Sequence, residues 1–159
     1  MGRRPMYPES PGASYSYTLI RVVPRVERGE YVNVGVVVFC SARAFLGARV
    51  VLDPTRLRAL APQLEMAHVE RHLRALLHIA NGDARGGPIA ELPPSERFHW
   101  LSAPRSTIIQ PAPAHGGVTN DPQTTLDELF ANLVRTDSST ARELAMNDST
   151  SADDVTEYA

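Results

Sequence analysis

The strongest constraint on the fold of this chain is the nearly continuous apolar stretch YVNVGVVVFC at residues 31–40. Alternation along a strand places one set of its side chains together on one face: Val32, Val34, Val36, Val38 and Cys40. The opposite face, which includes Val37 and Phe39, is also largely apolar. Because a strand that is apolar on both faces is typical of a sheet covered on both sides, we predict a buried central strand here.

Gly35 interrupts this apolar run, and glycines beside strands can form phosphate-binding loops. Such a loop needs several glycines at a strand-to-helix turn, where the backbone approaches a pyrophosphate. Here a single glycine lies inside a strand and a second strand follows. We therefore interpret Gly35 as a β-bulge or a point of close packing, and Cys40, at the end of the same run, as a core residue.

Three further strands are predicted around the central one. Residues 15–23 are β-branched and aromatic and end at Pro24, residues 45–53 follow a short connection and should form a hairpin with the central strand, and residues 106–110 form a later strand.

Helical patterns occupy most of the second half of the chain. Asp53 followed by proline predicts a helix start, an apolar stripe from Val69 to Ala80 predicts a helix that ends at Asn81-Gly82, and Ser95 is a candidate cap for a short helix through Trp100. Asp121 should cap the last helix, whose apolar positions recur at helical spacing: Leu126, Leu129, Phe130, Leu133 and Val134. The predicted fold class is α+β, a small antiparallel sheet of about four strands with helices packed against it.

The ends of the chain differ from its middle in composition. Residues 1–13 are rich in proline and glycine and are predicted to be a disordered leader, residues 14–136 a single α+β domain, and residues 137–159 a disordered acidic tail. Residues 1–136 carry fifteen arginines and twelve acidic residues, whereas residues 137–159 carry one arginine and six acidic residues. This mild positive excess, with 6% aromatic residues and no basic stripe, argues against nucleic-acid binding.

The cellular compartment is inferred from what the sequence lacks. No window approaches the roughly 20 consecutive apolar residues of a membrane helix, and the N-terminus has no apolar core of a secretory signal. Cys40 is the only cysteine, which fits a reducing compartment. We therefore expect a cytoplasmic protein without a membrane role.

Two segments concentrate side chains that could bind or react. The first is the charged segment that leads into the central strand, where loops at strand ends often carry function. The second is the mixed segment at residues 97–117, which offers two arginines as an anion clamp and histidines as general bases. The candidate interface or anion-binding residues are Arg21, Arg25, Glu27, Arg28, Glu30, Asn33, Arg97, His99, Arg105, Ser106, Gln110 and His115.

His68 and His72 lie one helical turn apart, which is a spacing of two metal ligands. The glutamate that a zincin motif places beside its first histidine is absent, since Val69 occupies that position and Glu70 follows one place later. No third ligand is apparent, so we predict no metal and no other cofactor.

Several blocks together resemble a bacterial family catalogued as domain of unknown function 3037. These blocks are YSYTLIRVVPRVERGEYVNVGVVVFC, FLGARVVLD, FHWLSAPRSTIIQPAPAHGG and DPQTTLDELFANLV, and they span most of residues 15–135. The resemblance implies a small bacterial protein and brings no activity or catalytic residue with it. Relatives are associated with genes for proteins similar to toxin-type serine/threonine kinases, which suggests a kinase-like partner.

The sequence leaves two hypotheses for function. The first is a non-enzymatic interaction or accessory module, with the charged loop and the segment around Arg105 as its contact surface. The alternative is a small enzyme or binding protein for a phosphorylated or carboxylated metabolite, with Glu27, Glu30, His99 or His115 as acid-base residues and Arg25, Arg28 and Arg105 as the clamp.

Overall fold

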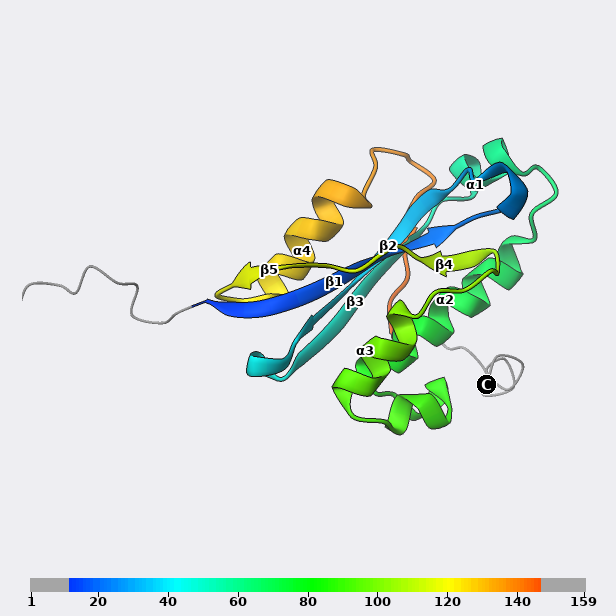
Figure 1. Cartoon of the computed structure of the whole chain (residues 1–159). Helices are drawn as coiled ribbons and strands as arrows, with labels where there is room; N and C mark the ends of the chain where they lie inside the picture. The colour runs from blue at the N-terminus through cyan, green and yellow to red at the C-terminus, as the bar shows by residue number, and fades with distance from the viewer. Residues whose placement is uncertain (1–11, 147–159) are drawn as a thin grey trace, which may run out of the picture.

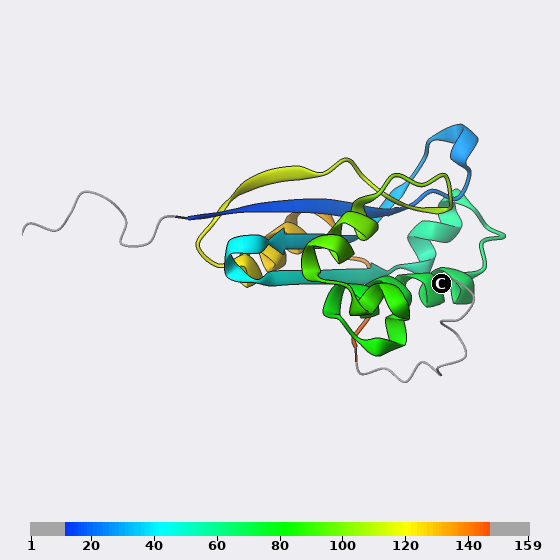
Figure 2. The same ribbon diagram turned by 60° about the horizontal axis from the view of Figure 1, so that its bottom comes forward.

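A computed structural model describes residues 12–146 and shows an antiparallel sheet at the centre of the fold (Figure 1). Its strands are β1 (Ala13–Val22), β2 (Val32–Cys40), β3 (Phe45–Leu52), β4 (Ile109–Pro111), β5 (His115–Thr119) and β6 (Arg142–Glu143). The strand order is β4-β1-β2-β3-β6, and β5 also pairs with β1. Both β4 and β5 follow the same edge of β1, β5 along its first half and β4 along its last residues (Figure 2).

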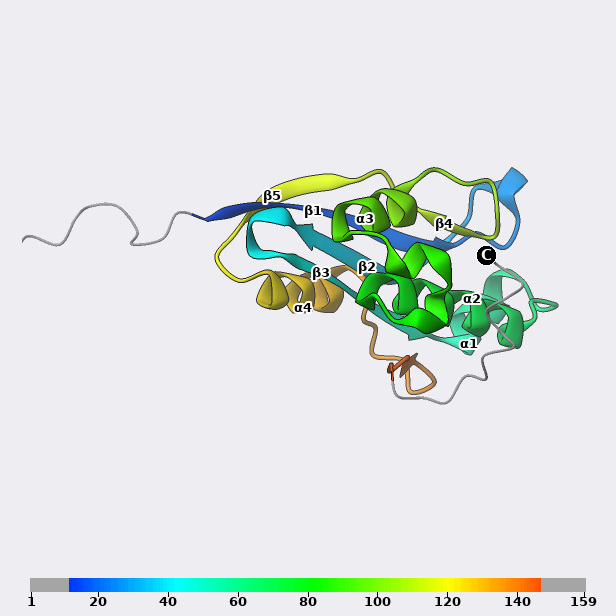
Figure 3. The same ribbon diagram turned by 90° about the horizontal axis from the view of Figure 1, so that it is seen from below.

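Helices cover both faces of this sheet, so the predicted α+β class is confirmed. The α-helices are α1 (Pro54–Leu60), α2 (Met66–Asn81), α3 (Pro94–Ser102) and α4 (Pro122–Leu133). Four short 3₁₀ helices lie in the connections. η1 (Val26–Arg28) lies between β1 and β2, η2 (Ser41–Arg43) lies between β2 and β3, and both η3 (Ala84–Gly86) and η4 (Pro88–Glu91) lie between α2 and α3. α2 and α3 lie against one face of the sheet and α4 against the other (Figures 1 and 3). The larger apolar cluster joins the sheet to α2 and α3, and a smaller cluster joins it to α4.

The described sheet has six strands where the sequence predicted about four. Two strands were missed because they are short and lack an apolar pattern: β5 contains two glycines, and β6 consists of Arg142 and Glu143 alone. The strand predicted at residues 106–110 is confirmed in part, since β4 begins only at Ile109. The predicted hairpin of β2 with β3 is confirmed.

A β-bulge in β2 corrects the predicted assignment of its faces. Ile20 pairs with Gly35 but Arg21 pairs with Asn33, so Val34 is an extra residue on β2. The extra residue inverts the alternation. Val32, Val34, Val37 and Phe39 therefore join the larger cluster, whereas Val36 and Val38 join the cluster under α4.

Gly35 also has the close packing that we expected of it. A Cβ atom at this position would lie 3.0 Å from Val50 Cγ2 and 3.1 Å from the carbonyl oxygen of Arg49 on β3. Of the two interpretations of Gly35, close packing is confirmed, whereas the extra residue of the bulge is its neighbour Val34. Cys40 at the end of β2 is fully buried, as predicted.

Most of the predicted helix ends are confirmed. The Asp53 carboxylate accepts from the backbone N–H of Arg56, and the Asp121 carboxylate accepts from that of Gln123. Gly82 ends α2 in the left-handed conformation, with φ 66°. Ser95 is not a cap: α3 begins at Pro94, so Ser95 already lies inside the first turn.

Residues 137–146 pack against the fold beyond the boundary that we predicted at residue 136 (Figure 3). β6 pairs with the outer edge of β3, Leu144 is buried, and Arg74 of α2 donates to the carbonyl oxygen of Ala145 at 3.2 Å. The predicted leader, apart from residues 12 and 13, and the tail from residue 147 onward lie outside the described residues.

Within residues 12–146, no helix combines the length and the apolar character that a membrane span requires.

Candidate functional site

The charged loop between β1 and β2 is neutralised by its own residues. Arg25 Nε donates to Glu27 Oε1 at 3.0 Å, and Arg28 Nε donates to Glu30 Oε1 at 2.6 Å. Arg25, Glu27 and Arg28 are exposed and Glu30 is half-buried, and η1 with the left-handed Gly29 turns the chain between the two strands. Each cation already has an anion beside it, so the loop offers little net charge to a ligand.

Arg21, Asn33 and Gln110 form a row across three neighbouring strands at one end of the sheet, because Arg21 pairs with both of the others. The Arg21 guanidinium lies 4.0 Å from the centre of the Tyr31 ring. Asn33 donates to the carbonyl oxygen of Leu133 at 3.4 Å, which ties β2 to the end of α4. These contacts join elements of the fold, and none of the three residues lines the pocket beside α2 or the two pockets near Arg25.

Arg97 and Arg105 do not form a clamp, because Arg97 binds the end of α2. Its Nη1 donates to the carbonyl oxygens of Ile79 and Ala80, both at 2.9 Å, and its Nε donates to that of Leu92 at 2.9 Å. The carbonyls of Ile79 and Ala80 lie in the last turn of α2, where the Ile79 carbonyl also accepts from the backbone N–H of Gly82 at 3.2 Å, and the cation suits the negative end of the helix dipole. Arg97 therefore holds α3 against the end of α2.

The remaining candidates of the mixed segment are spread over the surface. His99 lies on the exposed side of α3, and Ser106 is exposed in the loop after it. His115 is on β5, where its ring centre lies 5.7 Å from that of Tyr17. Gln110 Nε2 donates to the carbonyl oxygen of Thr107 at 2.7 Å. None of these four residues lines the pocket beside α2 or either of the two pockets near Arg25.

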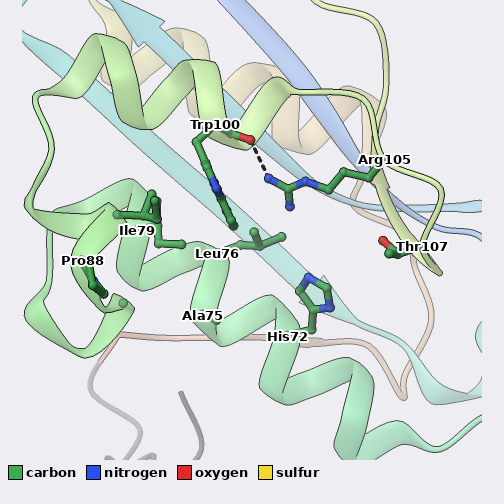
Figure 4. A pocket seen from close by; sticks show the side chains of 10 residues that line it. His72, Ala75, Leu76, Ile79, Pro88, Trp100, Arg105 and Thr107 are labelled. Carbon is green, nitrogen blue, oxygen red and sulfur yellow. Dashed lines mark hydrogen bonds between the residues drawn. The ribbon is translucent and has the colours of Figure 1, made fainter. Parts of the chain in front are cut away.

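Arg105 alone of the sequence candidates lines the pocket that the structure forms beside α2 (Figure 4). The pocket has a volume of about 310 Å³ and lies between α2, the η3–η4 segment, α3 and the loop that follows α3. Its walls are mostly apolar, and its lining residues are His72, Ala75, Leu76, Ile79, Gly86, Pro88, Ile89, Trp100, Arg105 and Thr107.

Local sequence features shape these walls. The apolar stripe of α2 faces the sheet and also supplies Leu76 and Ile79 to the pocket. Gly86 allows η3 to lie directly against α2, because a Cβ atom there would come within 2.9 Å of Ala90 Cβ and 3.0 Å of Ile79. The next residue, Gly87, has φ 77°, which only glycine adopts readily, and it turns the chain into Pro88 at the pocket rim.

The pocket has one apolar side and one polar side. Figure 4 shows Ile79 and Pro88 on one side of the Trp100 ring, and His72, Arg105 and Thr107 on the other. The Arg105 guanidinium lies 3.9 Å from the centre of the Trp100 ring, and its Nη2 donates to the Trp100 carbonyl oxygen at 2.5 Å. Trp100 and Arg105 therefore form one stacked unit at the boundary between the two sides.

Electrostatics make Arg105 the main charge of this site. Burial lowers the pKa of Arg105, yet guanidinium remains protonated in proteins. Burial, together with the positive charges of Arg105 and His68, lowers the pKa of His72 to about 4. At neutral pH, His72 is therefore uncharged and Arg105 supplies a single positive charge.

His68 and His72 do not share a metal site with further ligands in the described part of the chain. No group of three or more histidine, cysteine, aspartate or glutamate side chains within residues 12–146 could hold a metal ion. The two histidines line different pockets: His72 the one beside Trp100, and His68 a second one near Arg25 and Glu65.

Arg105 is the one residue of the pocket wall that is also among the predicted interface or anion-binding residues. We interpreted Trp100 as a core residue, and the structure places it both against the core and in the pocket wall. The available signal was that the only tryptophan of the chain lies five residues before an arginine that has no acidic neighbour in sequence. The sequence spacing of Trp100 and Arg105 could not show that Pro88 and Ile89 of η4 also line the pocket.

The fold and the pocket define an α+β protein with helices on both faces of an antiparallel sheet and a mostly apolar pocket that has a cationic side beside α2. Residues 17–134 match the family described as "Protein of unknown function (DUF3037)", and the chain belongs to this family. All the residues that line the pocket lie within the matched range. None of the curated proteins and none of the solved structures that were compared matches the chain.

Proposed function

We propose that this protein is a non-catalytic interaction module that holds a segment of a partner protein in the pocket between α2, η4 and α3. The observation that carries this proposal is the stacked pair of Trp100 and Arg105 beside an apolar cavity. Tryptophan and arginine are enriched among the residues that dominate binding energy at interfaces, particularly in well-packed pockets.

The geometry of the pair favours binding because the side chains of Trp100 and Arg105 are already held in place before a partner binds. Trp100 packs against the core cluster, and Arg105 is held by the Trp100 ring and carbonyl group. Side chains that are already fixed lose little conformational entropy on association.

The distribution of acid-base residues supports binding over catalysis. Glu27 and Glu30 are bonded to arginines in the β1–β2 loop, His99 is exposed on α3, and His115 lies on β5. General acid-base catalysis requires such groups within hydrogen-bond reach of one substrate. The mostly apolar pocket walls also suit an apolar side chain better than a sugar phosphate.

Affinity capture with matched variants tests the proposal. The tagged protein, an Arg105→Gln variant and an Arg25→Gln/Arg28→Gln double variant would be purified gently from the cells that make the protein. Stoichiometric companions would then be identified by mass spectrometry. We expect the loop double variant to retain the companions of the unmodified protein and Arg105→Gln to lose them, because only Arg105 lines the pocket beside Trp100.

Equal companions in the unmodified protein and in Arg105→Gln would contradict the proposal, provided that both proteins melt at similar temperatures. Loss of the companions in the loop variant alone would move the contact surface to the β1–β2 loop. A kinase-like companion is the first partner to look for, given the family resemblance.

A further inference from the structure

Arg105 carries a charge that the described protein does not balance. Six arginines of residues 12–146 lie within 4.0 Å of a carboxylate oxygen: Arg25, Arg28, Arg49, Arg74, Arg85 and Arg142. Arg105 is half-buried and makes no ion pair with any acidic residue of the described range. A partly buried charge without a counter-charge is unfavourable. An anion bound in the pocket would therefore be stabilised by the positive charge of Arg105.

The Arg105 guanidinium group has N–H donors that are available to bind such an anion. One Nη2 hydrogen bond goes to the Trp100 carbonyl oxygen, and within residues 12–146 its remaining N–H groups have no hydrogen-bond partner. Arg97 provides a contrast in the same segment, because its Nη1 and Nε are already used by three backbone carbonyls. A guanidinium presents five N–H groups in a planar fork that matches a carboxylate.

The number of charges selects the class of anion. Sites for phosphorylated groups usually gather several arginines, because a phosphate carries a charge of nearly two. This pocket has one arginine, and His72 is neutral at pH 7 because its pKa lies at about 4. A singly charged carboxylate therefore matches the site better than a phosphate.

The apolar walls of the pocket indicate which kind of chemical group should lie beside this carboxylate. Leu76, Ile79, Ile89 and the Trp100 ring provide an apolar space of about 310 Å³, which is at the lower end of the range for small-ligand pockets. Such a space suits one or two large apolar side chains. The adjacent Arg105 requires the negative charge to lie close to them.

We infer that the pocket binds a peptide segment of the partner in which a large apolar side chain lies next to a carboxylate, and that Arg105 ligates this carboxylate. The inference rests on the proposed interaction function and adds the chemistry that the partner segment must have. Charge complementarity with the unbalanced Arg105 is the argument for an acidic segment over a neutral or basic one.

Trp100 makes the test direct because it is the only tryptophan of the chain and lies in the pocket wall. Its fluorescence therefore reports on the pocket without labelling. The probes would be N-acetyl-leucyl-leucine, which ends in a carboxylate, and its C-terminal amide, which is neutral and otherwise the same. Each would be titrated into the full chain, into Arg105→Gln and into Arg58→Gln as a matched control at an exposed arginine.

We expect the acid to bind the unmodified protein and the control about tenfold or more tightly than the amide, as for a charge-assisted hydrogen bond. In Arg105→Gln this preference should disappear. Equal affinity of acid and amide, an unchanged preference in Arg105→Gln, or no response to either peptide would each overturn the inference.

Octanoate separates the peptide source from a free acid. Tighter binding of the peptide acid than of octanoate supports a partner segment, whereas binding of octanoate without the peptide would overturn it in favour of a small-molecule ligand. The capture experiment tests the interaction function with the natural partner, and the peptide titrations test carboxylate binding. One proposal can therefore fail while the other holds. Loss of capture in Arg105→Gln with no acid preference would retain the interaction function and discard the carboxylate.

Discussion

At the scale of single residues, two arginines eight positions apart illustrate how backbone position decides the use of a side chain. Arg97 projects from α3 onto the last carbonyls of α2 and stabilises that helix end. Arg105 follows α3 in a loop and folds back over Trp100 at the pocket. Both residues were equal members of a predicted anion clamp, because residue type and spacing did not show which carbonyl groups would lie within reach.

The role of Arg97 predicts a loss of stability when it is truncated. Arg97→Ala should lower the free energy of unfolding by about 2 kcal/mol, since it leaves three carbonyl oxygens without their charged donor. Urea denaturation would measure the change. Arg58→Ala, at an exposed position of α1, serves as the control and should stay within about 0.5 kcal/mol of the unmodified protein. A similar effect of both substitutions would contradict the capping role.

His72 predicts a specific acid sensitivity of the fold. Burial, Arg105 and His68 lower its pKa from 6.5 to about 4 in the folded protein, so between these values the unfolded chain binds more protons than the native chain. Stability should therefore fall as the pH decreases from 6.5 towards 4.

Comparison with His72→Gln isolates this contribution. Between pH 7.5 and pH 5.5, the unmodified protein should lose about 1 kcal/mol more stability than His72→Gln, measured from urea denaturation at each pH. Part of the slope should remain in the variant, because burial also lowers the pKa of His78. Identical pH slopes for the two proteins would show that His72 is protonated in the folded state at its ordinary pKa.

At the scale of elements, β2 shows both the strength and the limit of prediction from pattern. The apolar run of residues 31–40 correctly predicted a buried central strand, since either face of such a strand is satisfied by apolar neighbours. The same feature hid the bulge: with valines at almost every position, a shift of one residue leaves the composition of both faces apolar. Only the pairing of Ile20 with Gly35 and of Arg21 with Asn33 fixes the register.

The segment after α4 shows a second limit of this kind. Its polar composition suggested that nothing after residue 136 would pack, yet Leu144 is buried and β6 extends the sheet beside β3. One buried leucine and a two-residue strand are too little for a periodic signal. The ion pairs that attach the segment, from Glu143 to Arg49 and from Arg142 to Glu70, join positions that are distant in sequence.

This segment yields a prediction about the limits of the stable fold. Leu144→Ala should lower the free energy of unfolding by about 2–3 kcal/mol, because it removes a buried side chain from the main cluster. Asp137→Ala, at an exposed position of the same segment, should have little effect. If thermal and urea denaturation show no difference between the two variants, residues 137–146 contribute nothing to the stability of the core.

At the scale of the whole molecule, the fold class followed from patterns along the chain, but the site did not. Strands and helices have periods that sequence displays, and the helix caps at Asp53, Gly82 and Asp121 are local in sequence. The pocket joins α2 to residues around Trp100, and its shape depends on how η3 and η4 pack against α2. Arg105 was a candidate because of its side-chain chemistry. Only the structure showed that it lies at the pocket, whereas Arg25 and Arg28 lie in the β1–β2 loop.

The central claim is that the pocket beside Trp100, and not another face of the protein, contacts the partner. Site-specific photocrosslinking in living cells tests it most directly. A benzophenone amino acid would replace Thr107, an exposed residue at the pocket, or Val118, a residue on β5 that is 71% exposed. We predict a discrete adduct from position 107 and none from position 118. An adduct from position 118 alone, or none from position 107 while the partner still co-purifies with that variant, would contradict the account.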